Sequence, residues 1–534
     1  MTHRSAHRPT VREALIRLMR DFGIDTVFGN PGSTELPMFR QFPQDMQYVL
    51  GLQESTVVGM ADGYAQATRS IAMVNLHSAV GVGHAMGNIF TAYKNQTPLI
   101  ITAGQQARSI LPFDPYLFAS QSTDMPKPYV KWACEPARAA DVPLAFARAY
   151  YMAMQAPVGP VFLSIPSDDW EVETDWVASR TVSQAIGPDP ALLNQLYSEL
   201  NQAQRPVIIT GAGVARDSAV DQLVQLAELH HAAVYAAPMS ARCGFPERHP
   251  LFMGFLPAMR EKIVARLNEY DFILVLGAPA FTYHVDGTGP HIPPGSMCWQ
   301  IVDDPNTAAW TPAGNSMIAS IDLALDALIA AGAPSVRRSP PKARTAPPDP
   351  APRTPISAAY ALHLLDKLRG PHDVVVEEAP STRPTLQQYL PMDGEDHFYT
   401  MASGGLGWAM PAAVGIALGR RKLGRAGRII GLIGDGSAMY SIQALYSAVA
   451  LALPITFLIL NNRRYAALQE FAPVFGYAPD ERPTGTDLPG IDFVRLAEGH
   501  GLKAARVEDL NQLESSLNTA LQADGPYLLE LVIS

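Results

Sequence analysis

Short apolar runs alternate with helix-like stretches along the first third of the chain. The runs that we interpret as strands are 25–29, 47–52, 70–76 and 98–104, and the helix-like stretches are 11–25, 61–68 and 81–93. Strands that alternate with helices of this length are typical of a parallel, doubly wound sheet. The pattern therefore predicts an α/β fold class.

The same pattern is sharpest between Ile429 and Asn462. An apolar run at 429–433 ends in Gly434-Asp435-Gly436, and apolar positions at helical spacing follow up to Pro454. A second apolar run, ITFLIL, then ends in Asn461-Asn462. This order of strand, tight turn, helix and strand predicts a βαβ crossover.

Such a crossover brings the ends of its two strands to one edge of the sheet, where open α/β sheets bind ligands. Asp435 and Asn462 would there offer a carboxylate and an amide oxygen, which suit a hard cation such as Mg²⁺. Gly434 and Gly436 would let the backbone approach a diphosphate, and the helix start adds a favourable dipole. GDG alone is also an ordinary turn, so the prediction depends on the 24 residues between GDG and the paired asparagines.

Polar residues also follow strands in the first third of the chain. Ser33, Glu54 and His77 each stand just past an apolar run. We expect all three at one edge of one sheet.

Composition divides the chain into several parts. At 534 residues it is too long for one core. Residues 334–355 hold eight prolines among basic and small residues, which is typical of an extended linker. We predict doubly wound parallel-sheet domains at 1–185, 186–333 and 356–534, joined at 334–355 by this Pro-rich linker.

The middle domain contains a possible nucleotide motif. Gly211-Ala212-Gly213 follows an apolar run and resembles the start of a dinucleotide fingerprint, but Arg216 stands where the third glycine is needed. A tight strand-to-helix turn is the interpretation that we favour.

Charge and cysteine content narrow the partners and the location. The formal net charge is −10, which argues against nucleic acid or an anionic membrane as a main partner. Three scattered cysteines without a CxxC motif make a disulfide framework or zinc site unlikely, and a reducing cytoplasm fits best. The first 20 residues lack the apolar core of a signal peptide.

The motifs together resemble one enzyme family. NPGSTE at 30–35, LQE at 52–54, ADGYAQ at 61–66, LHS at 76–78 and GGLG at 404–407 accompany GDG and the paired asparagines. The chain resembles the 2-oxo acid decarboxylases that depend on thiamin diphosphate (ThDP), and among them the benzoylformate decarboxylases. The resemblance implies three α/β domains: pyrimidine-binding, central Rossmann-like and diphosphate-binding. It also implies active sites between subunits of a homo-oligomer, usually a tetramer.

The resemblance implies roles for individual residues. Glu54 would bond the pyrimidine ring of ThDP, Leu406 would support its bent shape, and the Gly404 backbone would accept from its amino group. Asp435, Asn462 and the backbone carbonyl of Arg464 would hold Mg²⁺ or Ca²⁺. Further cofactor contacts are implied for Ser381, Gly434, Gly436 and Ser437.

The implied reaction is the non-oxidative decarboxylation of an aromatic or bulky 2-oxo acid to an aldehyde and CO₂, through an intermediate carried by ThDP. His77 and His284 would move protons, a task suited to histidine, and Ser33 would bind the substrate carboxylate. The substrate pocket would include Ser33, Tyr116, Leu117, Arg383, Thr400 and Phe471.

Two departures from the family pattern bear on the cofactor and the substrate. Pro380 lacks the hydroxyl that usually contacts the diphosphate. Arg383 would favour a polar or anionic substrate tail if it faced the pocket, and it could equally face solvent.

Three other functions are compatible with the motifs. A ThDP carboligase or lyase, similar to acetolactate synthase or benzaldehyde lyase, generally lacks the two-histidine arrangement. A flavin-linked 2-oxo acid oxidase would use the central domain and would be yellow when purified. A non-catalytic relative would not need Glu54, His77 and His284 together.

Overall fold

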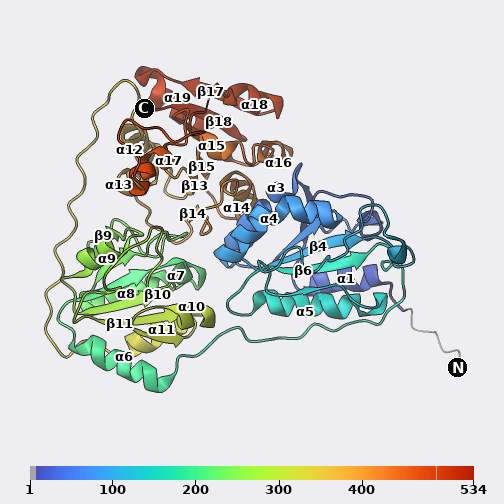
Figure 1. Ribbon diagram of the computed structural model, residues 1–534, viewed down its shortest axis with the longest axis horizontal. Coiled ribbons are helices and arrows are strands. Elements are labelled where there is room, and N and C mark those ends of the chain that lie inside the picture. The colour runs from blue at the N-terminus through green and yellow to red at the C-terminus, as the bar shows by residue number, and fades with distance from the viewer. Residues whose placement is uncertain (1–7, 489) are drawn as a thin grey trace. The chain divides into compact units, whose positions relative to one another are not determined.

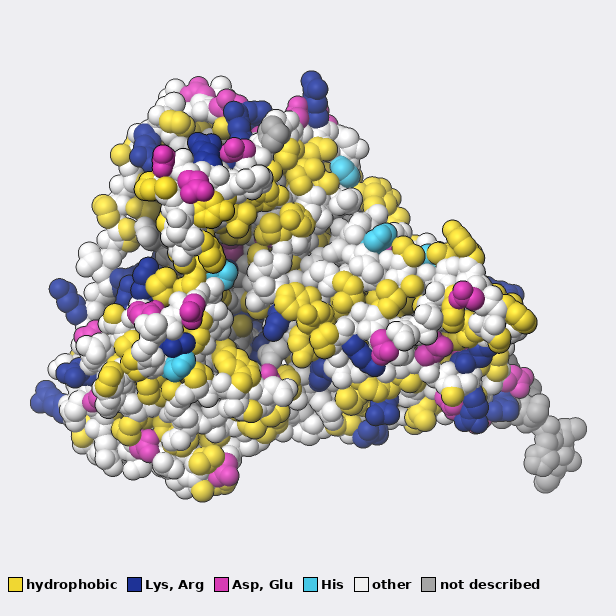
Figure 2. All heavy atoms as spheres, viewed as in Figure 1, with side chains coloured by type: hydrophobic (Ala, Val, Ile, Leu, Met, Phe, Trp, Pro, Cys, Tyr) yellow, Lys and Arg dark blue, Asp and Glu magenta, His cyan; other side chains and the backbone are white. Residues whose placement is uncertain are grey.

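The computed structural model describes residues 8–488 and 490–534 (Figure 1). The first seven residues, which belong to the segment examined for a signal peptide, lie outside this range. Within the described ranges, no helix is both long enough and apolar enough to cross a membrane. The visible face carries acidic and basic side chains interspersed with apolar ones (Figure 2).

Three sheets of six strands organise the chain, which confirms the predicted fold class. Every strand pair described is parallel. By contacts the chain divides into two compact units. The first unit comprises 1–183, 403–507 and 518–532, and the second comprises 184–402, 508–517 and 533–534.

The first sheet has the strand order β2-β1-β3-β4-β6-β5. Its strands are β1 (Thr26–Gly29), β2 (Gln47–Leu50), β3 (Ala72–Leu76), β4 (Leu99–Gln105), β5 (Ala133–Cys134) and β6 (Val161–Pro166). Its helices are α1 (Val11–Asp21), α2 (Leu36–Phe39), α3 (Glu54–Thr68), α4 (Ser78–Asn95) and α5 (Val142–Met154). α1 and α5 bury their apolar sides together on one face of this sheet (Figure 1).

The second sheet has the order β12-β11-β10-β7-β8-β9. Its strands are β7 (Pro206–Thr210), β8 (Ala233–Ala236), β9 (Phe252–Phe255), β10 (Phe272–Leu276), β11 (Met297–Val302) and β12 (Asn315–Ile318). The helices of this region are α6 (Pro190–Gln202), α7 (Ala212–Arg216), α8 (Val220–His230), α9 (Arg260–Leu267), α10 (Pro305–Trp310) and α11 (Ile321–Ala330). Alternate residues of its strands enter two separate apolar cores, one on each face.

The third sheet has the order β14-β13-β15-β16-β18-β17. Its strands are β13 (Val374–Glu378), β14 (Phe398–Thr400), β15 (Ile429–Gly434), β16 (Ile455–Asn461), β17 (Lys503–Val507) and β18 (Tyr527–Val532). The helices of this region are α12 (Ala358–Leu368), α13 (Arg383–Tyr389), α14 (Ala409–Lys422), α15 (Asp435–Ala438), α16 (Ala444–Ala450), α17 (Ala466–Phe471), α18 (Phe493–Gly499) and α19 (Leu510–Leu521).

The crossover predicted between Ile429 and Asn462 is present, with one difference. β15 and β16 pair in parallel, but the intervening helix is split into α15 and α16. α16 ends at Ala450. Two residues later, Ala452 has a left-handed φ of 47° and turns the chain toward β16. Pro454 disfavours a helical conformation at Leu453, so the helix has to end before that residue.

The glycines of Gly211-Ala212-Gly213 have a packing role. A Cβ atom on Gly211 would overlap Ala278, and one on Gly213 would lie 2.6 Å from the Cα of Gly277. The turn after β7 therefore touches the end of β10 at a distance that only glycine permits. This contact accounts for the motif without a nucleotide.

The Pro-rich stretch forms no helix or strand between α11 and α12, within the residues that the structure describes. One side chain fixes it to a neighbouring helix of the second unit: the buried guanidinium of Arg338 donates to the carbonyl oxygens of Leu200, Asn201 and Ala203 at the end of α6. It also donates to His230 at the end of α8. Arg338 thus satisfies carbonyl groups at two helix ends.

Candidate functional site

The first sheet gathers three of the predicted residues at its carboxyl edge. Ser33 lies in the loop after β1, His77 directly follows β3, and Glu54 is the first residue of α3 after β2. The strand order reverses between β1 and β3, and such a reversal is where doubly wound sheets bind ligands. The helix from Glu54 begins seven residues earlier than the predicted 61–68.

Glu54 and His77 are close neighbours across Gly81. A Cβ atom on Gly81 would lie 3.4 Å from Cγ of Glu54 and 3.6 Å from Cβ of His77. Gly81 also donates its backbone N–H to the His77 carbonyl at 2.8 Å. The absence of a side chain at Gly81 therefore keeps the space between the two functional groups open.

The His77 ring is oriented by a buried carboxylate. Its Nδ1 lies 2.8 Å from Oε2 of Glu35, whose side chain is 1% exposed. Because a carboxylate oxygen accepts, Nδ1 carries the proton and Nε2 is left as the atom that can exchange protons. The next residue, Ser78, has φ 45°, an uncommon value outside glycine and typical of functional sites.

Glu35 is a candidate site residue that the sequence interpretation missed. Its carboxylate also accepts from the backbone N–H groups of Gly32 at 2.8 Å and Gly104 at 2.9 Å, and from the Thr34 hydroxyl at 2.6 Å. Glu35 thus ties the loop that carries Ser33 to the His77 ring. Its place in the NPGSTE motif was the only signal, because sequence does not distinguish a buried glutamate from a solvated one.

Asp435 lies 4% exposed at the end of β15. Oδ1 accepts from Gly436 N at 2.8 Å, and Oδ2 accepts from Arg463 N at 2.7 Å. Burial raises the pKa of Asp435, and the backbone N–H groups of Gly436 and Arg463 oppose that rise. The second contact brings the segment after β16 onto the carboxylate, as the crossover predicted.

The donors around Asp435 fit a hard cation. Oδ1 of Asn462 accepts from Arg464 N at 3.2 Å, so its amide oxygen is turned toward the same backbone turn. Each carboxylate and amide oxygen retains a second lone pair for a ligand. A carboxylate, an amide oxygen and a main-chain carbonyl form an oxygen-only set, which suits Mg²⁺ or Ca²⁺.

The other residues predicted to contact the cofactor in the first unit lie beside glycines. Gly404 and Gly407 have φ values of 73° and 99°, which favour glycine, and Leu406 between them is half-buried. A Cβ atom on Gly436 would overlap the ring of Tyr465. Gly434 is the last residue of β15, and Ser437 is buried within α15.

The second unit carries His284 and Ser381. His284 is exposed, and its backbone N–H donates to the Ala258 carbonyl at 2.9 Å. Ser381 is half-buried two residues before α13. The structure describes this unit separately from the one that holds Glu54 and His77, so the roles of His284 and Ser381 stay predictions.

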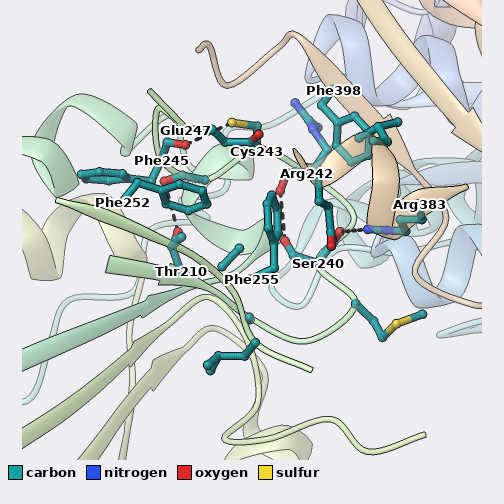
Figure 3. A pocket seen from close by; sticks show the side chains of 17 residues that line it. Thr210, Ser240, Arg242, Cys243, Phe245, Glu247, Phe252, Phe255, Arg383 and Phe398 are labelled. Carbon is teal, nitrogen blue, oxygen red and sulfur yellow. Dashed lines mark hydrogen bonds between the residues drawn. The ribbon is translucent and has the colours of Figure 1, made fainter. Parts of the chain in front are cut away.

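Arg383 forms a network inside the second unit. Nη1 lies 3.4 Å from Oε2 of Glu377 and 3.4 Å from the Thr400 hydroxyl. Nη2 donates to the Ser240 carbonyl at 2.7 Å (Figure 3). The Thr400 hydroxyl donates to the same Glu377 oxygen at 2.9 Å, so two residues predicted for the substrate pocket share one buried carboxylate.

This network borders the cavity that Figure 3 shows. Arg242, Cys243 and Glu247 also line it, together with apolar side chains. Burial raises the pKa of Glu247 to about 8. The cavity carries charged groups that already have partners: Glu247 accepts from Met392 N at 3.0 Å, and Arg242 donates to Asp396 at 2.8 Å.

The other predicted pocket residues lie in loops and a short helix of the first unit. Tyr116 is 87% exposed, and the adjacent Leu117 has a left-handed φ of 64°. Phe471 ends α17 and packs edge-on against Phe475 with ring centres 5.5 Å apart. Their contacts with a substrate stay predictions.

Comparison with known proteins matches all three parts of the chain to one family of models. The thiamine pyrophosphate enzyme models match at 9–124 for the N-terminal TPP-binding domain, 193–328 for the central domain and 381–531 for the C-terminal TPP-binding domain. The cofactor predicted from the motifs, thiamin diphosphate, is the same molecule.

Individual relatives agree with this match. Benzoylformate decarboxylase of Pseudomonas aeruginosa is 41% identical over 98% of both chains. The crystal structure of benzoylformate decarboxylase from Polynucleobacter necessarius covers 98% of both chains at 40% identity with a TM-score of 0.96. The ThDP-dependent 4-hydroxybenzoylformate decarboxylase of Rhodococcus jostii is 38% identical, with a TM-score of 0.94 and coverage of 98% of this chain and 99% of that one.

A more distant relative gives the contrast. The acetolactate synthase large subunit of Haemophilus influenzae is only 23% identical, over 95% of this chain and 91% of its own. The carboligase alternative therefore has the weaker similarity. With three matched domains and about 40% identity over the full length, the chain belongs to the family of thiamin-diphosphate-dependent 2-oxo acid decarboxylases.

Proposed function

We propose that this enzyme converts an aromatic 2-oxo acid of the benzoylformate type into the corresponding aldehyde and CO₂. The observation that carries the proposal is the group of Glu54, Ser33 and the Glu35-bound His77 at one sheet edge. It combines a carboxylate, a hydroxyl donor and an oriented imidazole. The substrates named for the relatives in Pseudomonas, Polynucleobacter and Rhodococcus support the choice of an aromatic acid.

The residues divide the work between cofactor and substrate. Glu54 would bond the pyrimidine ring of ThDP, while Asp435 and Asn462 would hold Mg²⁺ and through it the diphosphate. When bound, ThDP supplies a carbon nucleophile and accepts the electron pair that decarboxylation releases. The Ser33 hydroxyl would donate to the substrate carboxylate.

His77 would move the proton. Its Nδ1 proton is held by Glu35, so Nε2 can give and take a proton beside the reacting carbon without a change of tautomer. His284 would be the second proton-transfer group, as the family resemblance implies.

The pairing of Arg383 with Glu377 bears on substrate choice. A guanidinium that already has a carboxylate partner at 3.4 Å has less charge to offer an anionic substrate tail. We therefore favour an uncharged aromatic ring over a dicarboxylic substrate.

Exposed apolar side chains bear on the assembly, and the cysteines bear on the location. Phe475, Leu468 and Tyr440 in the first unit are 71%, 56% and 56% exposed, which supports their burial in a homo-oligomer, a tetramer as the family resemblance implies. Cys134, Cys243 and Cys298 are free thiols, which supports a cytoplasmic location.

A substrate panel tests the proposal. Purified protein with ThDP and Mg²⁺ is incubated with aromatic, branched and dicarboxylic 2-oxo acids, and both aldehyde and 2-hydroxyketone are measured. We expect benzaldehyde from benzoylformate, with the hydroxyketone as a minor product. No aldehyde from any acid would refute the proposal, and hydroxyketone as the main product would favour the carboligase alternative.

A further inference from the structure

A second histidine contacts the glutamate that we assign to the cofactor. His84 lies in the second turn of α4, which packs against α3. Its Nδ1 is 3.2 Å from Oε2 of Glu54. The Glu54 side chain is 13% exposed and that of His84 is 58% exposed, so the carboxylate is shielded while the imidazole remains in reach of water.

The local structure holds this pair in place. Gln53 caps α3 by accepting from Thr56 N at 3.0 Å, which fixes the backbone beside Glu54. Nε2 of Gln53 lies 3.5 Å from the His84 carbonyl, so the same residue bridges toward α4. Gly81, one turn before His84, leaves room for the Glu54 side chain, whose Oε1 would lie 3.5 Å from a Cβ atom there.

The chemistry of the contact follows from the two groups. A carboxylate oxygen only accepts, so His84 donates from Nδ1. Glu54 Oε2 is then engaged, and Oε1 is left for another donor. Histidine is also the side chain whose charge changes near neutral pH, whereas an amide donor at the same place would stay neutral.

We propose that His84 is a positioning residue for Glu54, which orients its carboxylate toward the ThDP pyrimidine and makes cofactor affinity depend on the charge of His84. This rests on the proposed role of Glu54 in binding ThDP. An imidazolium at His84 would compete with the pyrimidine for the Glu54 carboxylate. It would also repel a protonated pyrimidine nitrogen that is bonded to Glu54. A positive charge on His84 should therefore weaken ThDP binding.

The neighbouring ionisable groups already have partners of their own. Asp62, also on α3, accepts from Gln66, Asn95, Thr97 and Trp408. His77, before α4, bonds Glu35, and Lys94 near the end of α4 lies over the Phe90 ring. Three basic residues lie on α14, which packs against α3. Lys422 donates to Asp25 and Tyr64. Arg421 donates to the Leu451 carbonyl, and Arg420 donates to the Ala426 carbonyl. Tyr93 on α4 lies edge-on to Tyr129.

The test measures cofactor binding without substrate. The dissociation constant of ThDP for the cofactor-free protein, at saturating Mg²⁺, is measured by quenching of tryptophan fluorescence from pH 5.5 to 8.5. The variants are His84→Asn, which keeps an N–H donor but cannot titrate, and His84→Ala, which removes the donor. Because the diphosphate itself titrates in this range, the comparison is between proteins at each pH.

We expect wild type and His84→Asn to bind alike at pH 8.5. At pH 5.5 we expect wild type to bind more weakly than His84→Asn, by about 10-fold for each pH unit over which one linked proton is taken up. His84→Ala should bind more weakly than both at pH 8.5. An unchanged pH dependence in His84→Asn, or full affinity in His84→Ala, would overturn the proposal. Since no substrate is present, a negative substrate panel would leave this result unaffected.

Discussion

At the residue scale, the site depends on pairs of side chains that sequence does not link. Glu35 and His77 are 42 positions apart, and their 2.8 Å contact arises only because β1 and β3 lie side by side. Ser33, Glu54 and His77 could be predicted because each follows a strand. Their partners Glu35 and His84 could not, since strand ends indicate an edge but not which neighbours meet there.

Replacing the His77 partner should impair catalysis. In Glu35→Gln an N–H₂ group replaces one of the two carboxylate oxygens. Both oxygens of Glu35 accept hydrogen bonds, one from His77 and the backbone and the other from the backbone, so the amide cannot satisfy all of these donors and the imidazole loses its fixed tautomer. We expect kcat/KM to fall by at least ~10-fold, toward the ~10²-fold loss expected for His77→Ala. The pH profile of kcat/KM should shift as well.

A half-buried glutamate of the same unit provides the control. Glu135 accepts from the hydroxyls of Ser122 and Ser164 elsewhere in the first unit. Glu135→Gln should cost stability but leave the pH profile of kcat/KM unchanged. Equal profiles for wild type and Glu35→Gln would remove Glu35 from the orientation of His77.

At the element scale, the closest helix contact in the first unit joins α3 and α14. A Cβ atom on Gly415 would overlap the Met60 carbonyl oxygen, and one on Gly63 would overlap the backbone of Ala412. This contact explains why the sequence pattern predicted α3 poorly. Because residues 56–60 of α3 are all buried, they lack the exposed polar face from which a helix is recognised.

The α3–α14 contact predicts opposite effects for two glycine substitutions. Gly415→Ala forces the two backbones apart, and we expect it to lower the free energy of unfolding by about 1–3 kcal/mol. Gly87→Ala in α4 meets no atom within 4 Å, so it should raise the free energy of unfolding by about 0.5–1 kcal/mol through helix propensity. Urea unfolding measures both, and equal effects would show that the contact is looser than described.

The helix ends bound by Arg338 predict an acid sensitivity. His230 accepts from Arg338 through Nδ1, and burial, aided by the Arg338 charge, lowers the pKa of His230 to about 4. In the unfolded chain the ordinary value is about 6.5, so the unfolded state binds the extra proton between these values. Stability is fully present above about pH 6.5 and is lost as the pH falls toward 4, by up to about 3 kcal/mol.

Two histidine variants separate this effect from general acid denaturation. His230→Gln should flatten the dependence of unfolding free energy on pH between 4 and 6.5. The adjacent His231 is exposed at a left-handed position that asparagine tolerates, so His231→Asn should retain the wild-type slope. A wild-type slope in His230→Gln would assign the acid sensitivity to other groups.

At the scale of the whole molecule, the sequence predicted the three sheets and the strand ends at which Ser33, Glu54 and His77 stand, but not the contacts that close each unit. Arg338 illustrates the limit: composition indicated an extended Pro-rich segment, whereas its attachment to two helix ends depends on tertiary structure. Likewise, Arg383 could face solvent or a pocket from sequence alone. Its contact with Glu377 depends on how β13 meets α13.

The division into two compact units predicts how cofactor should stabilise the enzyme. Glu54 and Asp435, which we assign to opposite ends of ThDP, both belong to the first unit. ThDP and Mg²⁺ at 100 times their dissociation constants should raise the unfolding free energy of that unit by about 2.7 kcal/mol. Differential scanning calorimetry should show a higher transition temperature with cofactor, and a chelator should reverse the shift.

Two aspartates identify the source of that stabilisation. Asp435→Asn removes the single carboxylate of the proposed metal set, so the cofactor-dependent shift should disappear at the same ligand concentrations. Asp492 lines a cavity beside Asp435 and caps α18 by accepting from Arg495 N at 3.0 Å. Because asparagine also caps helices, Asp492→Asn should keep the full shift. A full shift in Asp435→Asn would instead place the cation elsewhere.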